Sequence, residues 1–323
     1  MAREGDFSGV ISVRNGTDIA FEQAYGSANR ADARPNTPGT QFGLASGAKG
    51  FTALTVMHLV ESGTLQLSTS ARSVLGTDLP LIDDAVTIEH LLAHRSGIGD
   101  YLDEDLIDEL EVWPFSVPAR ALEATADYLA LLDGHPHKFP PGTRFSYCNG
   151  GYVTLAIICE RATGVAFHDL VRTAVTETAA MTRTAFLRMT ALPEAAAIGY
   201  LDDGRTNIAN MPERGSGDGG IFSTVADLER FWHAFFAGTM VSTNSVAAMV
   251  APRSDEPSSE RRRYGLGFWL HRSNEAVMLE GLDAGVSFRS THDPRRSLTA
   301  TVISNTTDCA WPIVRHLKEI LGL

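Results

Sequence analysis

Ser46 and Lys49 are the first two residues whose types and spacing could do chemistry, within the run Ala45-Ser46-Gly47-Ala48-Lys49. On a helix, residues i and i+3 share a face, so the lysine amine and the serine hydroxyl can come within hydrogen-bonding reach. Free backbone N–H groups at the helix start would stabilise an oxyanion formed beside this serine. The spacing is therefore typical of an activated serine nucleophile. A solvated surface pair is the alternative interpretation, because the pattern fixes only two positions.

Tyr147 and Asn149 form a second candidate pair, in Tyr147-Cys148-Asn149. A tyrosine of pKa ~10 and a lysine of pKa ~10.4 are both poor bases at neutral pH. Serine, lysine and tyrosine in mutual contact could share one proton and titrate together. Without that contact, Tyr147 would be a buried aromatic residue and Asn149 a helix N-cap.

The elements that must position these residues follow from hydrophobic periodicity and turn residues. Strand patterns occur near both ends of the chain, an amphipathic helix follows Ser46, and most of the middle is helical. We expect an α/β (α+β) fold in which residues 1–72 and 218–323 form a sheet lobe and residues 73–217 an inserted helical lobe. The active site would lie in the cleft between the lobes. The predicted strands are 7–13, 19–25, 264–270, 276–279, 286–291 and 298–305, and the predicted helices include 88–93, 121–132, 152–162, 167–178, 225–236 and 313–321.

Composition excludes several classes of function. Lys and Arg number 27 against 39 Asp and Glu, a formal charge of -12, which disfavours nucleic acid and anionic membranes as partners. The three cysteines have no C-x-x-C spacing, and no apolar run approaches the ~18 residues of a membrane span. The first six residues lack the apolar core of a secretory signal, so we expect a cytoplasmic protein, although a removed signal would leave a similar start.

Three other patterns are interpreted as structural. His90 and His94 have the spacing of helical zinc ligands, but no third ligand accompanies them. Residues 215–220 match G-x-G-x-x-G without a preceding strand, so we expect a loop at the edge of the cleft. Cys148 is expected to be a small spacer that faces the protein body. We therefore expect no metal and no cofactor.

Taken together, the motifs resemble the serine β-lactamase-related hydrolases, which include class C β-lactamases, DD-peptidases, family VIII esterases and D-aminopeptidases. The resemblance runs nearly end to end, with the motifs in the family's order. It implies a five-stranded antiparallel sheet flanked by helices, with an all-helical lobe, as in β-lactamases and transpeptidases. The matching segments are 45–49, 65–67, 86–98, 141–152, 219–224 and 264–268.

The resemblance also implies roles for the candidate residues. Ser46 would be the acylated nucleophile, and Lys49 would accept or relay its proton. Tyr147 would be the general acid and base for the leaving group and the deacylating water. Asn149 would orient the substrate, and the backbone N–H of Ser46 would form half of the oxyanion hole.

The third motif of the family, Lys- or His-Thr-Gly on a cleft strand, is replaced here by Leu279-Glu280-Gly281. The cation is lost at Leu279, and Glu280 stands where a threonine hydroxyl would meet a substrate carboxylate. Two carboxylates ~4 Å apart repel by roughly 4 kcal/mol at an effective dielectric of ~20. Gly281 keeps the family's residue, and the N–H of Leu282 would be the second oxyanion donor. A shift of register that turns Glu280 to solvent is the alternative.

We therefore expect a cofactor-free serine hydrolase that acts through an acyl-enzyme on small esters or amides. The substrates would be neutral, or would carry a free amine that faces Glu280. D-amino-acid amidase or aminopeptidase activity and weak β-lactamase activity are alternatives, and a non-catalytic binding protein is an alternative of another class. Loops 100–118 and 251–264 would form the pocket walls, and the acyl group, leaving group and oligomeric state stay open.

Overall fold

The computed structural model describes most of the chain, and its gaps fall on segments for which the sequence made predictions. The N-terminal start and parts of both predicted pocket-wall loops lie outside the described residues, which are 7–104, 111, 115, 117–256 and 262–323. Among these residues, no helix has the length and apolar character needed to cross a membrane.

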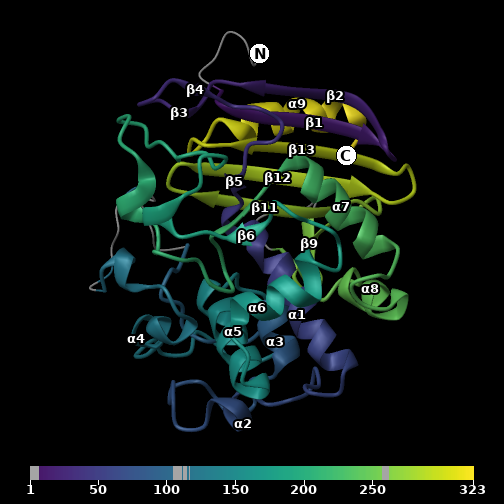
Figure 1. Ribbon diagram of the computed structural model, residues 1–323. Coiled ribbons are helices and arrows are strands. Elements are labelled where there is room, and N and C mark those ends of the chain that lie inside the picture. Colours follow the sequence, from purple (N-terminus) through teal and green to yellow (C-terminus); the bar gives the residue numbers. More distant parts are fainter. Residues whose placement is uncertain (1–6, 105–110, 112–114, 116, 257–261) are drawn as a thin grey trace.

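An antiparallel sheet of eight strands forms the upper layer of the molecule (Figure 1). The N-terminal hairpin pairs with the last strand, so both ends of the chain build the sheet, as predicted. Five long strands make up the sheet that was expected, and three short ones extend it. In sheet order they are β2 (Asp18–Tyr25), β1 (Gly9–Asn15), β13 (Leu298–Ser304), β12 (Val286–Asp293), β11 (Val277–Asp283), β10 (Trp269–His271), β9 (Arg262–Tyr264) and β8 (Ser254–Asp255).

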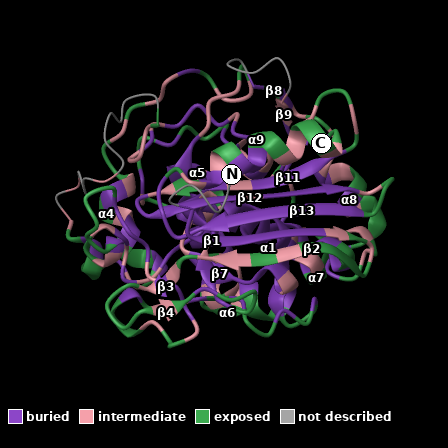
Figure 2. Ribbon diagram, turned by 90° about the horizontal axis from the view of Figure 1, so that it is seen from above, coloured by how far each residue is buried: buried purple, intermediate pink, exposed green. Residues whose placement is uncertain are grey.

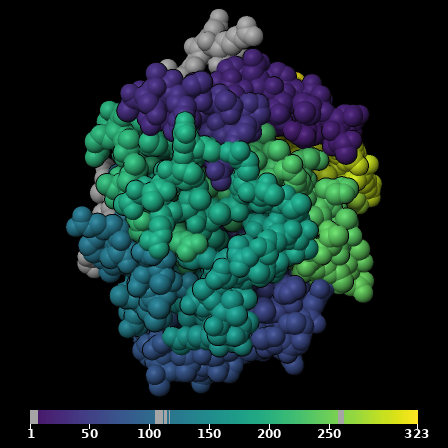
Figure 3. Space-filling model, in the orientation of Figure 1, coloured from purple at the N-terminus to yellow at the C-terminus, as the bar shows by residue number. Residues whose placement is uncertain are grey.

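Helices cover both faces of this sheet and fill the lower part of the molecule, where the blue and teal middle of the chain forms the surface (Figure 3). The α/β fold class is confirmed, whereas the division into lobes at residues 72 and 217 stays a prediction. The α-helices are α1 (Ala48–Glu61), α2 (Ala71–Leu75), α3 (Ile88–Leu92), α4 (Leu129–Leu132), α5 (Asn149–Thr163), α6 (Phe167–Val171), α7 (Val225–Phe236), α8 (Thr243–Met249) and α9 (Ala310–Leu321). The remaining strands are β3 (Ser27–Asn29), β4 (Arg34–Pro35), β5 (Phe42–Gly43), β6 (Ala185–Phe186) and β7 (Ile221–Ser223).

Alternate residues of the central strands pack on opposite sides of the sheet. Ile11 and Val302 contact α9, whereas Val10 and Ile303 belong to the main core with α1 and α7. Seen from above, the central strands are buried and the edge strand β2 is largely exposed (Figure 2). A sheet covered on both faces gives a rigid support for residues on β11 and β12.

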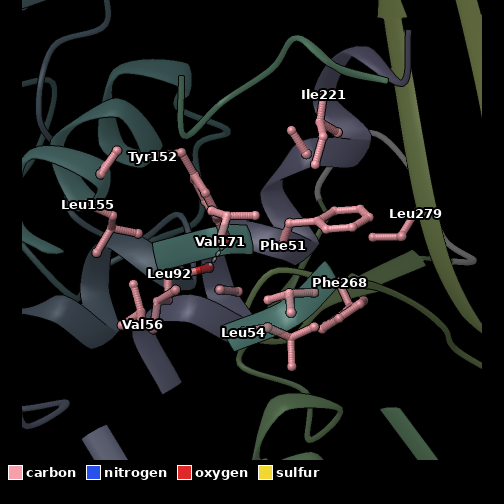
Figure 4. Close-up of a cluster of buried hydrophobic side chains, with 14 of the residues drawn as sticks. Phe51, Leu54, Val56, Leu92, Tyr152, Leu155, Val171, Ile221, Phe268 and Leu279 are labelled. Carbon is pink, nitrogen blue, oxygen red and sulfur yellow. Dashed lines mark hydrogen bonds between the residues drawn. The ribbon is translucent and has the colours of Figure 1, made fainter. Parts of the chain in front are cut away.

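Helix α1 differs from its prediction as an amphipathic helix, because it is buried all round from Ala48 to Met57. It lies between the sheet and α5, so no side of its first turns reaches solvent. Figure 4 shows Phe51 of α1 beside Leu279 of β11. A Cβ atom on Gly50 would lie 2.5 Å from the Leu279 side chain, so this glycine lets α1 approach β11 closely.

Three predicted elements are broken up in the structure. The segment 121–132 forms short turns and only one α-helical turn. The Asp127 carboxylate accepts the N–H groups of Glu123 and Ala124, so these groups are not used in helical hydrogen bonds. The helix at 167–178 changes to a π-helical turn after Val171. The strand at 264–270 is split by a turn in which Gly267 has a φ of +89°.

Candidate active site

Ser46 lies in a single 3-10 turn, Ala45–Gly47, that leads directly into α1. Ala45 has a φ of +44°, a left-handed conformation that residues other than glycine rarely adopt. Backbone strain of this kind is concentrated at functional sites. The turn therefore places the serine hydroxyl at the start of a helix, where the sequence predicted it.

Lys49 is 2% exposed, and its Nζ atom contacts three oxygen atoms. These are Ser46 Oγ at 2.9 Å, Asn149 Oδ1 at 2.7 Å and the backbone oxygen of Asp218 at 2.9 Å. An ammonium group would donate one hydrogen bond to each oxygen. A neutral amine would donate to the amide and backbone oxygens, which only accept, and would accept from the Ser46 hydroxyl. The same arrangement thus suits both protonation states, as a lysine that takes a proton from serine requires.

The environment moves the pKa values of Lys49 and Tyr147 in opposite directions. Burial lowers the pKa of Lys49 from its ordinary value, against the attraction of Asp218, Glu104 and Asp100. Burial raises the pKa of Tyr147 well above its ordinary value, and the charge of Glu104 raises it further. A lysine that accepts protons and a phenol that donates them are the roles this environment favours.

The ring of Tyr147 is held between aromatic groups. The Trp269 ring is parallel to it within 8°, with the centroids 5.8 Å apart, and the His94 ring lies 4.3 Å away. The Nδ1 atom of His94 accepts the N–H of Cys148 at 3.0 Å, so a neutral His94 carries its proton on Nε2. Lys49 Nζ lies 4.8 Å from the Tyr147 ring centroid. Tyr147 is therefore placed beside Lys49, as its predicted role requires.

Asp100 positions the segment that carries Tyr147 and Asn149. Its carboxylate accepts the N–H of Asn149 at 2.6 Å and the N–H of Gly150 at 2.8 Å, at the start of α5. A negative charge is stabilising at a helix N-terminus, although burial raises the pKa of Asp100 to about 6. Cys148, rather than Asn149, is the N-cap, and it is buried as predicted.

Gly281 brings β11 against the turn that holds Ser46. A Cβ atom at this position would lie 2.1 Å from the backbone oxygen of Leu44 and 2.8 Å from the backbone nitrogen of Ser46. Only glycine fits such an approach. Gly281 was predicted to lie on a strand that lines the cleft, and the structure places it there, beside Ser46.

Leu282 lies opposite Ser287 in the hairpin that Asp283 and Val286 close with a two-residue loop. Antiparallel pairs alternate between hydrogen-bonded and non-hydrogen-bonded, and the closing pair of such a hairpin is hydrogen-bonded. Leu282 therefore turns its N–H away from β12. On its other edge, β11 pairs with β10 only through Val277 and Met278, within the described residues. The N–H of Leu282 is thus not used in the β11–β12 ladder, and its role as the second oxyanion donor stays a prediction.

Glu280 is not the unpaired carboxylate that was expected from the sequence. It lies directly opposite Arg289 on β12 and forms an ion pair with it. Arg262 Nη1 on β9 donates to the same carboxylate at 2.8 Å. The carboxylate is neither bare nor turned to solvent, so its expected repulsion of a substrate carboxylate is offset by two guanidinium groups. Its role in substrate binding stays a prediction.

The cleft beside Ser46 has a volume of about 950 Å³. It combines apolar walls with charged groups, and the glycine-rich loop at 215–220 forms part of its edge, as predicted. No group of three or more His, Cys, Asp or Glu residues in the described ranges could hold a metal ion. Instead, the His90 ring caps α3 by accepting the N–H of Thr87.

Three contributors were not identified from the sequence. Asp218 accepts the Lys49 hydrogen bond with its backbone oxygen, which any type of residue could supply. Asp100 is separated from the segment it positions by 49 residues, and Trp269 is separated from Tyr147 by 122. The sequence placed Asp100 in a predicted pocket-wall loop and Asp218 in the predicted loop at the cleft edge, but it gave neither residue a role.

Comparison with known proteins gives concordant matches. The family model described as Beta-lactamase matches residues 1–314. Penicillin-binding protein 4* of Bacillus subtilis is 29% identical over 293 residues, covering 85% of this chain and 62% of its own length. Esterase EstB of Burkholderia gladioli is 32% identical over 209 residues, 62% of this chain and 52% of its own. The crystal structure of a penicillin-binding protein from Bacillus halodurans superposes with a TM-score of 0.92 at 32% identity, covering 98% of both chains. The chain thus spans less than two thirds of the length of these two curated relatives.

Proposed function

Because the chain belongs to the β-lactamase family, we propose that it is a serine hydrolase that forms an acyl-enzyme on Ser46 with small esters or amides. The observation that carries this proposal is the 2.9 Å contact between Lys49 Nζ and Ser46 Oγ within a buried hydrogen-bond network. An esterase among the relatives supports hydrolysis of simple acyl compounds.

In the acylation step, neutral Lys49 takes the Ser46 hydroxyl proton as Oγ attacks the substrate carbonyl carbon. The carbonyl oxygen becomes an oxyanion that accepts hydrogen bonds from the N–H groups of Ser46 and Leu282. Collapse of this intermediate breaks the bond to the leaving group, which takes a proton from the Tyr147 phenol. The proton that Lys49 took from Ser46 then passes to the Tyr147 phenolate, so the site ends acylated on Ser46 with Lys49 neutral and Tyr147 protonated.

In the deacylation step, water attacks the acyl carbon and loses a proton to the Lys49–Tyr147 pair. The second tetrahedral intermediate collapses, the proton returns to Ser46 Oγ, and the carboxylic acid product leaves. Asn149 supports both steps, because its Oδ1 atom holds Lys49 at 2.7 Å while its Nδ2 atom donates to the backbone oxygen of Leu102 at 2.9 Å.

Weak β-lactamase activity is disfavoured by position 279. Leu279 is 2% exposed and packs against α1, so this position on β11 supplies no cation to the cleft. A binding protein without catalysis would not need a lysine, a serine and a tyrosine in one buried proton network. We therefore propose a small-molecule ester or amide as the partner of this site, and neither nucleic acid nor membrane.

The test compares wild type with Ser46→Ala and with Ser68→Ala, which removes an exposed serine outside the cleft. Initial rates are measured for short p-nitrophenyl esters, D- and L-amino-acid p-nitroanilides and a chromogenic cephalosporin, together with labelling by a fluorophosphonate. We expect turnover and labelling in wild type and Ser68→Ala, and neither in Ser46→Ala. Turnover that persists in Ser46→Ala, or labelling of another residue, would exclude Ser46 as the nucleophile. A wild type that is neither labelled nor active would support the binding-protein alternative.

A further inference from the structure

We propose that the cleft contains a subsite for an ammonium group, formed by Asp283 and Asn207. The inference rests on the proposed function, because the ammonium group would belong to the acyl substrate of Ser46. It narrows the substrate class to amino-acid esters and amides with a free amine.

Asp283 is the last residue of β11 and directly follows Leu282, the proposed oxyanion donor. It lines the cleft, and its Oδ1 atom accepts the N–H of Ala284 in its own turn, at 2.9 Å. Within the described part of the chain, Asp283 has no ion-pair partner. One carboxylate oxygen therefore stays available to a ligand.

Asn207 is an independent indication of a ligand beside Asp283. It is 2% exposed and lines the cleft, and its Nδ2 atom donates to the backbone oxygen of Ala284 at 2.8 Å. A carbonyl can only accept, so the amide nitrogen must face Ala284 and Oδ1 the other way. This Oδ1 atom has no hydrogen-bond partner among the described residues. Gly199 fixes the amide, because a Cβ atom there would lie 2.3 Å from Nδ2.

A buried acceptor without a donor is costly, and such groups usually have a partner. Asp283 and Asn207 together offer acceptors and no free donor, since Nδ2 is already used. A ligand with several N–H donors and a positive charge satisfies both groups. An ammonium group has this chemistry, whereas a carboxylate or an ether oxygen does not.

The surrounding charges favour a cation in the same place. Burial, together with the nearby carboxylates of Asp218 and Glu104, raises the pKa of Asp283 to about 7, against the opposing charge of Lys49. A bound ammonium would lower this pKa and stabilise the ionised carboxylate. Amine binding is therefore expected to strengthen as the pH rises through 7, up to the pKa of the amine itself.

This location differs from the one expected from the sequence, in which a free amine faced Glu280. Glu280 is already paired with Arg262 and Arg289, so it attracts a cation weakly. Asp283 lies one residue beyond Leu282, a rise of about 3.3 Å along the strand. An α-amine nitrogen lies about 2.5 Å from the carbonyl carbon of its own amino acid, given ordinary bond lengths. The spacing suits an amine close to the reacting carbonyl.

The experiment compares p-nitroanilides or p-nitrophenyl esters of one amino acid with a free or an N-acetylated amine, from pH 6 to 8.5. The readout is the ratio of kcat/KM for the free-amine and acetylated substrates in wild type, Asp283→Asn and Asp18→Asn. Asp18 provides the matched control, since it is an exposed aspartate on the edge strand β2. Binding of the free amino-acid amide to Ser46→Ala by calorimetry gives a readout that does not require turnover.

We expect the wild-type ratio to exceed one and to rise with pH through about 7. Asp283→Asn should lower it by about 10- to 100-fold, the range for a hydrogen bond to a charged group, and Asp18→Asn should not. A wild-type ratio near one across the pH range would overturn the subsite, and this result requires no variant to fold. If the acetylated substrate is hydrolysed with a kcat/KM as high as that of the free-amine substrate, the ammonium subsite is refuted and the proposed hydrolase function stands. Absence of turnover and of labelling at Ser46 would instead refute the proposed function.

Discussion

Replacing Lys49 by methionine and, separately, by arginine tests whether this residue acts as a base. Methionine keeps much of the side-chain volume and removes the amine. Arginine keeps the positive charge but cannot give up its proton under ordinary conditions. If Lys49 accepts the Ser46 proton, both variants lose activity, whereas a purely electrostatic role would be preserved by arginine.

The expected loss of activity and of stability follows from the loss of a base and of the hydrogen bonds that Lys49 Nζ donates. General-base catalysis contributes about 10²- to 10⁴-fold, and a loss of about 10³-fold in kcat/KM corresponds to about 4 kcal/mol. Methionine also leaves Asn149 Oδ1 and the backbone oxygen of Asp218 without the donors they have at 2.7 and 2.9 Å. Losing such donors costs about 1–3 kcal/mol each, partly offset because a buried amine is no longer desolvated.

The assay is kcat/KM for a neutral p-nitrophenyl ester, with circular dichroism and a thermal melt to show that each variant is folded. In wild type, the rate should rise with pH as Lys49 loses its proton, along a limb that lies below the ordinary lysine pKa because burial lowers it. The reasoning is refuted if a folded Lys49→Arg variant keeps activity within about tenfold of wild type, since the expected loss is about 10³-fold.

Three further predictions concern residues around the nucleophile. Gly281→Ala should lower kcat/KM by at least about 10²-fold, which is the effect of losing one oxyanion donor. The new Cβ atom would lie 2.1 Å from the Leu44 oxygen and push β11 away from Ser46, so near-normal ester kinetics would contradict this prediction. Asp100→Ala should destabilise the protein by about 2–4 kcal/mol in urea unfolding, because the buried N–H groups of Asn149 and Gly150 lose their acceptor; an unchanged midpoint would show that water replaces it. Asp283→Asn should stabilise the protein above pH 7, because folding raises the pKa of this carboxyl from 3.8 to about 7 and makes its ionised form costly. At about 1.4 kcal/mol per pH unit the limit is about 4 kcal/mol, and the gain should disappear as the pH falls through 7 towards 4; a pH-independent gain would exclude this explanation.

The sheet could be predicted from the sequence because its strands lie near the ends of the chain and carry clear turn signals. Gly16 between β1 and β2 has a φ of +57°, as a tight hairpin needs. The helical segments were harder to predict in detail. At 121–132, the hydrogen bonds that the Asp127 carboxylate accepts from the backbone outweigh the apolar pattern. In α1, burial on all sides comes from its tertiary position between the sheet and α5, which periodicity within the helix cannot reveal.

The proton network was predictable where it depends on residue type and spacing, as for Ser46, Lys49 and Tyr147. It was not predictable where backbone atoms act, as with the Asp218 oxygen that accepts from Lys49. Glu280 shows a third case. Its position on the strand could be read from the sequence, but its charge environment depends on Arg289 across the strand pair and on Arg262 of β9.

The loss of a cation at position 279 has a consequence for the order of proton transfer. Ionisation of Tyr147 is disfavoured by burial and by the charge of Glu104, and Leu279 offers no charge to compensate. Lys49 supplies a cation beside the Tyr147 ring, with Nζ 4.8 Å from the centroid. Once Lys49 has taken the Ser46 proton it is positively charged, and it stabilises a developing phenolate most at that moment. Tyr147 should therefore release its proton only after Ser46 has been deprotonated, which makes the phenol a donor to the leaving group rather than the base that starts the reaction.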